Sequence, residues 1–239
     1  MSVEGSVRDR RRAETIREIK DAALTQLDET GAASLSLRAV ARAIGMTVQS
    51  LYHYFDSRDA LLAALLVDAH NQLADAVRAA ADATAGETPL ARRLATTGAF
   101  REWAIANRSA FLLIYGTPVP GFDPEVHEVP SQAAVRLAVP FAEAVFSGWT
   151  AAEIADMPLP PGGTNLGDVA IPEVPMPLSP GALALFIEMR GLMHGLVMLE
   201  LIGHLQPFTQ VGAEFFTASM HRMSEMIDSL KPTPKPLTG

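Results

Sequence analysis

Apolar residues recur at three- and four-residue intervals along most of the chain, a spacing that predicts α-helices. Two short sets near the N-terminus predict two short helices: Leu37, Val40, Ala41 and Ile44, then Val48, Leu51 and Phe55. Gly45 lies between the sets and can adopt the left-handed conformation that ends many helices. Ser36 and Thr47 precede the two sets and are expected to be their N-caps. The sequence therefore predicts two short helices joined by a tight turn.

The outward positions of the second short helix carry hydrogen-bonding groups and no Lys or Glu. They are Gln49, Ser50, Tyr52, His53 and Tyr54. Their hydroxyls, amide and imidazole can contact base edges and phosphates. Two interpretations fit: a helix-turn-helix that places its second helix in the DNA major groove, and an ordinary helical hairpin in an all-α core.

Longer amphipathic patterns flank this helix pair. Residues 8–31 carry apolar residues on one side and end at Gly31, and residues 56–59 can cap a longer helix that follows. The whole run from Ile16 to Leu66, IREIKDAALTQLDETGAASLSLRAVARAIGMTVQSLYHYFDSRDALLAALL, resembles the DNA-binding domain of the TetR (tetracycline repressor) family of bacterial transcription regulators. The resemblance covers about the first quarter of the chain.

This resemblance implies an all-α fold of about nine helices. A three-helix DNA-binding domain with the helix-turn-helix would occupy residues 8–56, and a larger helical ligand-binding and dimerisation domain would occupy residues 57–239. The expected DNA-binding residues are Arg12, Ser36, Arg38, Thr47, Val48, Gln49, Ser50, Tyr52, His53, Tyr54 and Arg58.

Individual roles follow from chemistry and from the resemblance. Gln49 can form two hydrogen bonds with an adenine edge, and Arg38 can reach a guanine or a phosphate. Tyr52 is similar to the phosphate-contacting tyrosine of the family, and Arg58 stands where the family often places a phosphate-binding Lys. Tyr54 stands where many members have His, which leaves its role open.

The formal net charge of −8 is divided unevenly along the chain. Residues 1–60 hold nine basic and nine acidic residues, whereas the other residues hold 10 basic and 18 acidic ones, a net of −8. We therefore expect the acidic part to face away from DNA. The arginines between Arg8 and Arg12 form a basic arm that either contacts phosphates or the minor groove, or is only a solubilising tail.

Composition also limits the other classes of function. The chain has no cysteine, which excludes disulfides and thiolate sites and suits the cytoplasm, and its polar N-terminus does not resemble a signal peptide. No Gly-rich phosphate loop, GxSxG or HExxH motif is present, and Glu200 with His204 offers too few ligands for zinc. We expect no enzyme activity, no cofactor and no metal.

Residues 181–205 form the most apolar segment, but Glu188, Arg190, His194 and Glu200 interrupt it. Its longest uncharged run is far below the ~20 residues of a membrane span. We expect a buried helix, surrounded by apolar contacts on several sides, and no membrane association. Before it, residues 158–180 form a loop rich in Pro and Gly.

The last helix carries apolar residues at alternating four- and three-residue spacing, which predicts a packing seam. Within one chain this seam would close the core. The family resemblance instead implies that the last two helices pair with those of a second subunit in a four-helix bundle, and a two-fold dimer suits a palindromic operator. The expected dimer-interface residues are Gly191, Gly195, Phe216, Met220, Met223 and Ile227.

The run RGLMHGLVMLELIGHL resembles the branch of the family whose C-terminal domain is named for a Trp, a His and a Gly. His194 and Gly195 match that pattern, whereas Arg190 stands where the Trp is expected. Aromatic residues and methionines of this part are either ordinary core or the lining of an apolar ligand cavity. The expected lining residues are Phe100, Trp103, Phe111, Tyr115, Phe141, Phe146, Met189, Arg190, Met193, His194 and Met198.

Together these patterns predict a homodimeric transcription regulator that binds a palindromic operator in double-stranded DNA. The simplest form is a repressor that is released by a small hydrophobic or aromatic effector. The alternatives are a dimeric DNA-binding regulator without a small-molecule effector, and an activator.

Overall fold

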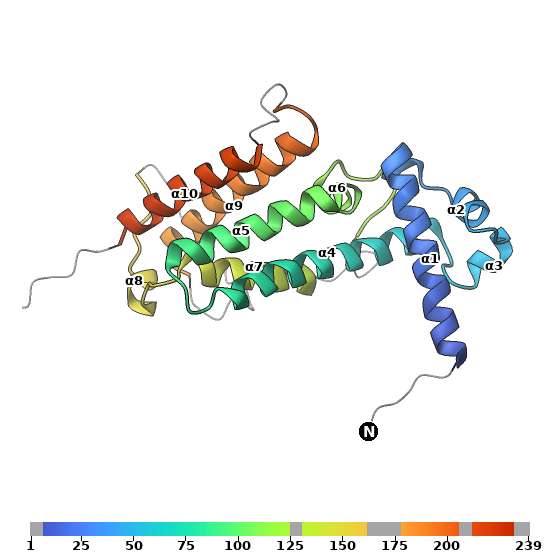
Figure 1. The fold of residues 1–239 in the computed structure, drawn as a ribbon, viewed down its shortest axis with the longest axis horizontal. Helices are drawn as coiled ribbons and strands as arrows, with labels where there is room; N and C mark the ends of the chain where they lie inside the picture. The colour runs from blue at the N-terminus through green and yellow to red at the C-terminus, as the bar shows by residue number, and fades with distance from the viewer. Residues whose placement is uncertain (1–6, 125–130, 162–177, 206–211, 232–239) are drawn as a thin grey trace, which may run out of the picture. The chain divides into compact units, whose positions relative to one another are not determined.

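The computed structural model describes residues 7–124, 131–161, 178–205 and 212–231, and all regular structure in these ranges is helical (Figure 1). The predicted all-α class is confirmed. The described residues form ten α-helices and one 3-10 helix, and the short α8 is the helix that the sequence analysis did not predict. The elements are α1 (Val7–Thr30), η1 (Ala32–Ser34), α2 (Leu37–Ala43), α3 (Val48–Tyr52), α4 (Arg58–Ala83), α5 (Pro89–Ala106), α6 (Arg108–Tyr115), α7 (Ser131–Val145), α8 (Ala151–Ala155), α9 (Pro180–Leu201) and α10 (Gly212–Ser229).

The chain divides into two compact units. The first comprises Met1–Asn71 with Asn107–Ser131, and the second comprises Gln72–Ala106 with Gln132–Gly239. The first half of α4 and all of α6 are therefore grouped with the N-terminal helices, although the sequence analysis placed both in the larger domain. Most of the Pro- and Gly-rich loop at 158–180 lies outside the described residues.

The core of the first unit joins the apolar faces of α1 to α4. Ile19, Val40, Leu51 and Leu61 are all fully buried in it, as the helical spacing predicted. Val119, from the segment after α6, packs into the same cluster. This core holds the two short helices in place, because neither α2 nor α3 is long enough to be stable alone in water.

The turn between α2 and α3 has the predicted chemistry. Gly45 adopts φ 67°, and the amides of Gly45 and Met46 donate to Arg42 O (3.3 Å) and Ala41 O (2.8 Å), which satisfies the last carbonyls of α2. Thr47 caps α3, because its hydroxyl accepts a hydrogen bond from the Ser50 amide at 3.1 Å. Ser36 occupies the N-cap position of α2, but its side chain forms no cap hydrogen bond, so that part of the prediction is wrong.

In the second unit, α5 packs against both α9 and α10 (Figure 1). Phe100 and Trp103 of α5 are buried as predicted. Helix α7 ends at Val145 rather than near Trp149, and α8 follows it with a capping box between Thr150 and Glu153. Hydrogen bonds from the Thr150 amide and hydroxyl favour the carboxylate of Glu153 and hold its pKa below the ordinary value.

The packing seam of α10 lies inside the single chain. Phe216, Met220 and Ile227 are buried and Met223 is half-buried, because α5 and α9 of the same chain cover this side of α10. The structure therefore corrects the expectation of a dimer interface for Phe216, Met220 and Ile227, whereas a dimer contact by the half-buried Met223 stays a prediction. The seam closes the core of one chain, which was the other interpretation of the same spacing.

Helix α9 is buried on several sides from Gly181 to Phe186, as expected, but on one side only from Ile187 onward, which corrects the expectation for the rest of the helix. Phe186, Met189 and Met193 face the core, whereas Ile187 and Leu199 are exposed. Among the described helices, α9 alone is long and apolar enough to cross a membrane, but its buried side packs against α5 and α10 as a core helix does. Gly191 and Gly195 are exposed, and a side-chain carbon added at either position would meet no atom within 4 Å.

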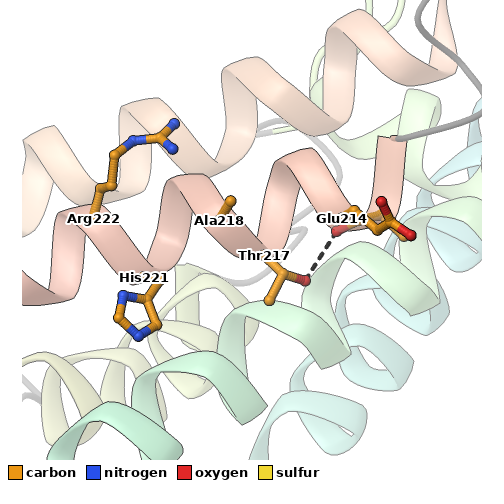
Figure 2. Close-up of a pocket in the computed structure, with 6 residues that line it drawn as sticks. Glu214, Thr217, Ala218, His221 and Arg222 are labelled. Atoms are coloured by element: carbon orange, nitrogen blue, oxygen red, sulfur yellow. Dashed lines mark hydrogen bonds between the residues drawn. The ribbon is translucent and has the colours of Figure 1, made fainter.

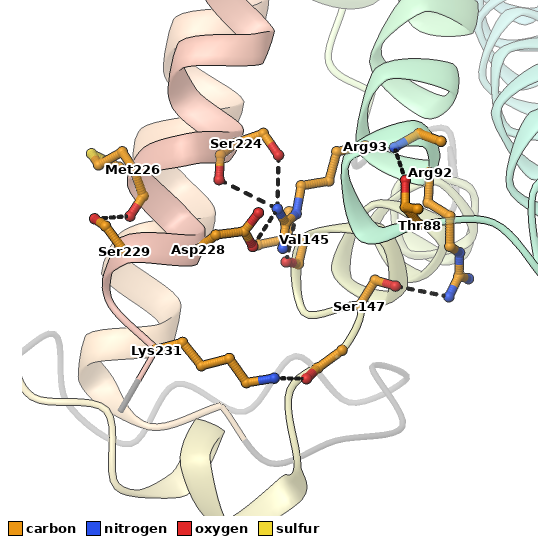
Figure 3. A network of polar contacts seen from close by, with 12 residues as sticks. Thr88, Arg92, Arg93, Val145, Ser147, Ser224, Met226, Asp228, Ser229 and Lys231 are labelled. Atoms are coloured by element: carbon orange, nitrogen blue, oxygen red, sulfur yellow. Dashed lines mark hydrogen bonds and ion pairs between the residues drawn. The ribbon is translucent and has the colours of Figure 1, made fainter. Parts of the chain in front are cut away.

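A buried arginine ties three elements of the second unit together (Figure 3). Arg93 of α5 is only 2% exposed, and its Nε donates to Val145 O at 3.1 Å. Its Nη1 donates to Ser224 Oγ and to Asp228 Oδ1 on α10, both at 2.7 Å. A buried cation needs such partners, since an unpaired one carries a large desolvation cost. The sequence analysis did not identify Arg93.

Candidate nucleic-acid interface

Helix α3 presents its polar side to solvent because its apolar side is anchored in the core. Leu51 is fully buried and Val48 is half-buried, while Gln49, Tyr52 and His53 are exposed. The exposed side therefore offers an amide, a phenol and an imidazole on about one and a half helical turns. These are groups that can donate to and accept from base edges and phosphates.

The start of α3 is fixed by local hydrogen bonds. The hydroxyls of Thr47 and Ser50 lie 2.8 Å apart, and Thr47 also accepts from the Ser50 amide. The Thr47 side chain therefore caps α3, and the Ser50 hydroxyl is bonded to that cap. Gln49 lies between them in sequence and points its amide to solvent.

Arg12 reaches the end of α3 from the first turns of α1. Its guanidinium carbon lies 4.9 Å from the centre of the Tyr54 ring, a cation–π contact, and its Nη2 donates to His53 O at 3.4 Å. The residue is nevertheless exposed. The structure thus brings Arg12 beside the exposed side of α3 and keeps its charge accessible to solvent.

Gln26 links α1 to the start of α2. Its Oε1 accepts from the Ser36 amide at 3.3 Å, and its Nε2 donates to Ser34 O at 3.2 Å. The sequence analysis did not identify Gln26, since an isolated Gln on a long amphipathic helix carries no signal of such a role. Arg38 lies in the first turn of α2 and is exposed, as a DNA contact requires.

Arg58 is placed differently from the other candidates. Its guanidinium donates to the carbonyl oxygens of Ala32, Ala33 and Leu35, between 3.0 and 3.1 Å, and pairs with Asp59 at 3.3 Å. These bonds turn the group toward the connection between α1 and α2. A phosphate contact by Arg58 stays a prediction, and it would compete with these hydrogen bonds.

The candidate ligand residues fall into two groups. Phe100 lies against the Phe141 ring, with centroids 5.8 Å apart, and against the His194 ring at 4.7 Å. Phe111 and Tyr115 contact each other at 4.9 Å in the first unit and so belong to a different cluster. In the second unit the buried candidates are Phe100, Trp103, Phe141, Phe146, Met189 and Met193, and the half-buried ones are Arg190, His194 and Met198.

His194 is neutral at neutral pH in this environment. Burial disfavours the imidazolium and the nearby charge of Arg190 disfavours it further, which together lower the pKa of His194 to about 4. A neutral imidazole beside the Phe100 ring gives the cluster one polar group in a largely apolar setting.

A surface hollow lies along α10 and is distinct from this cluster. Its lining residues all come from that helix, and Figure 2 shows His221 and Arg222 pointing away from each other there. The hollow is open to solvent, and its only hydrogen bond in Figure 2 runs from the Thr217 hydroxyl to Ala213 O within the helix, at 2.9 Å. It therefore offers a surface rather than an enclosed ligand site.

Two family descriptions match the chain. The sequence model described as "Bacterial regulatory proteins, tetR family" matches residues 19–65, which include α2 and α3. The one described as "Tetracyclin repressor-like, C-terminal domain" matches residues 93–223, which is 131 of the 239 residues. The second match alone covers more than half of the chain.

Curated relatives carry the same kind of description. The HTH-type transcriptional regulators Rv1816 of Mycobacterium tuberculosis and Mb1846 of Mycobacterium bovis are each 41% identical to this chain over 132 residues. The match covers 54% of this chain and 55% of each relative, so the chain spans about half the length of the curated relatives it matches.

Solved structures share the fold over most of the chain. SCO4313, described as a regulatory protein, is 32% identical with a TM-score of 0.71, and the match covers 91% of this chain and 98% of that one. The TetR family transcriptional regulator PfmR from Thermus thermophilus is 16% identical with a TM-score of 0.59, over 87% of this chain and 97% of that one. This second likeness shows the fold alone.

The environment of His194 predicts a pH-dependent stability. In the unfolded chain a histidine binds a proton near pH 6.5, whereas folded His194 resists protonation until about pH 4. The folded state therefore loses stability as the pH falls from about 6.5 toward 4, because the unfolded state binds more protons in that window. Between pH 7 and pH 5 the loss from this group should be about 1–2 kcal/mol.

Urea unfolding at the two pH values measures this loss. The variant His194→Gln should lack it, so its free energy of unfolding should fall less than that of the wild type. The same substitution at His204, which is exposed, is the matched control and should follow the wild type. An equal fall in the wild type and His194→Gln would contradict the prediction.

Proposed function

The chain belongs to the TetR family of bacterial regulatory proteins, and from that premise we propose that it is a repressor that binds a palindromic operator as a homodimer and is released by a small hydrophobic or aromatic effector. Family members and the similar relatives are transcription regulators rather than enzymes. The site of action would be the bacterial cytoplasm.

The exposed polar side of α3 carries the proposal. Gln49, Tyr52 and His53 are exposed on a helix whose other side is buried through Leu51. The backbone of α3 therefore has its conformation before DNA binds. Such a helix can enter the major groove without refolding. Gln49 is suited to read an adenine edge, and Tyr52 is suited to a phosphate.

Positive charge lies at the end of this helix and on the helix that packs against it. Arg12 stands at its C-terminal end and Arg38 is exposed on α2. Both can neutralise phosphates, which positions a protein on DNA with little sequence information. We propose residues 8–56 as the DNA-binding module. In this module α3 contacts the base edges, and the residues around α3 contact the phosphates.

Replacing Gln49 by Ala should weaken operator binding by about 1–3 kcal/mol and relax the preference at one base position. The expected loss on random DNA is much smaller, since non-specific binding depends on phosphate contacts. Gln72→Ala, at an exposed position of α4 outside the module, is the matched control and should bind as the wild type does. Titration of labelled operator and random duplexes measures both affinities, and equal losses on the two would contradict the role of Gln49.

The exposed side of α9 supports a homodimer. Ile187, Gly191, Gly195 and Leu199 recur every four residues on this side, and Ile202 continues it beyond the helix. Apolar residues in line with glycines allow a second helix to pack closely, with the ridges of one in the grooves of the other. The exposed Phe215 and Met226 of α10 extend the apolar area, as expected for the face of an isologous dimer.

A charge within this face should prevent association. Ile187 is 50% exposed, and the variant Ile187→Glu should shift the protein from dimer to monomer while leaving the folded monomer intact. Ile105 of α5 is 42% exposed and lies outside the face, so Ile105→Glu is the matched control and should remain dimeric. Analytical ultracentrifugation distinguishes a dimer from a monomer for each variant. A wild-type monomer, or a dimeric Ile187→Glu, would contradict the proposed interface.

The effector site that we propose is the cluster around Phe100. The aromatic rings of Phe100 and Phe141 and the neutral imidazole of His194 favour an apolar or aromatic compound with one polar group. Helix α4 belongs to both compact units. A ligand that displaces α4 would therefore change the distance between the two α3 helices of the dimer. For a complete switch the ligand must prefer the released state by about 5.5 kcal/mol.

Fluorescence anisotropy of an operator duplex, in the presence of a library of hydrophobic and aromatic compounds, tests this effector hypothesis. At least one compound should lower operator affinity in the wild type, and Phe100→Ala should abolish the response through loss of the aromatic contact. If no compound changes operator affinity at any occupancy, the effector part of the proposal fails, and a dimeric regulator without a small-molecule ligand remains.

A further inference from the structure

Arg58 is the first residue of α4, and its guanidinium is directed back to the connection between α1 and α2. Nη2 donates to Ala32 O at 3.0 Å and to Ala33 O at 3.1 Å, and Nε donates to Leu35 O at 3.1 Å. The acceptors belong to η1 and to the residue that follows it. A planar guanidinium with five N–H donors can serve several carbonyl groups at once, which a lysine ammonium on a flexible stem cannot do with the same geometry.

The connection that Arg58 binds is also held by Gln26 of α1, which bonds to Ser34 and Ser36. Gly31 leaves α1 with φ 78°, and η1 then provides a single short turn before α2 begins at Leu37. A carbonyl oxygen can accept two hydrogen bonds, and Ala32 O has one from the Leu35 amide at 3.3 Å, so it can accept a further donor from elsewhere. Arg58 supplies such donors from α4 and so joins the start of α2 to the start of α4.

All three nitrogens of the guanidinium are engaged. Besides the carbonyl bonds, Nη1 pairs with Asp59 Oδ1 at 3.3 Å, and the side chains of both residues are partly buried. The adjacent carboxylate reduces the attraction of the guanidinium for a phosphate. A phosphate contact would require Arg58 to leave acceptors that it already satisfies.

On the basis of the proposed DNA-binding function, we propose that Arg58 is a positioning residue that sets the register of the helix pair α2–α3 on α4, and that it does not contact phosphate. The apolar contacts of Leu37 and Leu61 bury both helices but are not directional. The hydrogen bonds of Arg58 are directional and fix where α2 starts relative to α4. Lys20 of α1, paired with Asp68 of α4 at 2.6 Å, provides a second tie within the same unit.

Binding of a wild-type operator duplex and a random duplex, measured by anisotropy over a range of salt concentrations, separates the two roles of Arg58. The key variant is Arg58→Lys, which keeps the positive charge but removes the planar guanidinium and its array of N–H donors. We expect its operator affinity to fall about tenfold or more, since hydrogen bonds to charged groups are lost. Its affinity for random DNA and the slope of log affinity against log salt should stay unchanged, because no phosphate contact is lost.

Two further variants complete the experiment. Arg17→Lys, at an exposed position of α1, is the matched control and should bind both duplexes as the wild type does. Arg58→Ala should lose operator affinity in the same way as Arg58→Lys, and circular dichroism with thermal unfolding restricts the comparison to folded protein. If Arg58→Ala does not fold, Arg58→Lys and its control still decide the question.

The opposite pattern overturns the inference. If Arg58 contacts a phosphate, Arg58→Lys should keep its operator affinity. Arg58→Ala should then bind both duplexes more weakly, and its slope of log affinity against log salt should be smaller by about one. That result would leave the DNA-binding function intact. A wild-type protein that does not distinguish operator from random DNA would instead refute the proposed function, and this inference with it.

Discussion

Helix α4 supplies buried side chains to both compact units, and the rest of the structure depends on this shared helix. Leu61 and Leu65 near its start are buried in the first unit, and Leu73 and Val77 further along are buried in the second. A helix is stiff over this length because each residue is hydrogen-bonded to the next turn. The effector response that we propose depends on this stiffness.

The first unit uses apolar and polar contacts for different purposes. Burial of Leu51 and its neighbours provides most of the stabilisation of the short helices, but it does not specify their orientation closely. Gln26, Arg12 and Arg58 each add a directional bond between two elements: α1 with the start of α2, α1 with the end of α3, and α4 with the turn after α1. The second unit uses the buried Arg93 in the same way, joining α5 to α10 and to the end of α7.

The sequence predicted the first unit well because its signals are local. Periodic apolar residues, the left-handed Gly45 and the Thr47 cap each act within a few residues, so α1 to α4 could be placed without knowledge of the fold. The seam on α10 was harder, because the spacing of Phe216 and Met220 is the same whether the covering helix belongs to this chain or to another copy. The hydrogen bonds of Arg58 and Arg93 could not be predicted for a related reason. Many of their partners are backbone carbonyls, and no residue type in a sequence reports which carbonyls will lack a donor.

The central claim is that this chain reads a specific DNA sequence as a two-fold dimer. The most direct measurement is to select fragments of the genome that encodes it by binding to the purified protein, and to sequence the bound fragments. We expect one enriched palindrome, with half-sites about one helical turn or a multiple apart, because each subunit of the proposed dimer presents one α3. If no motif is enriched, or if the enriched site has a single half, then α3 is not used for specific readout by a dimer and the account is contradicted.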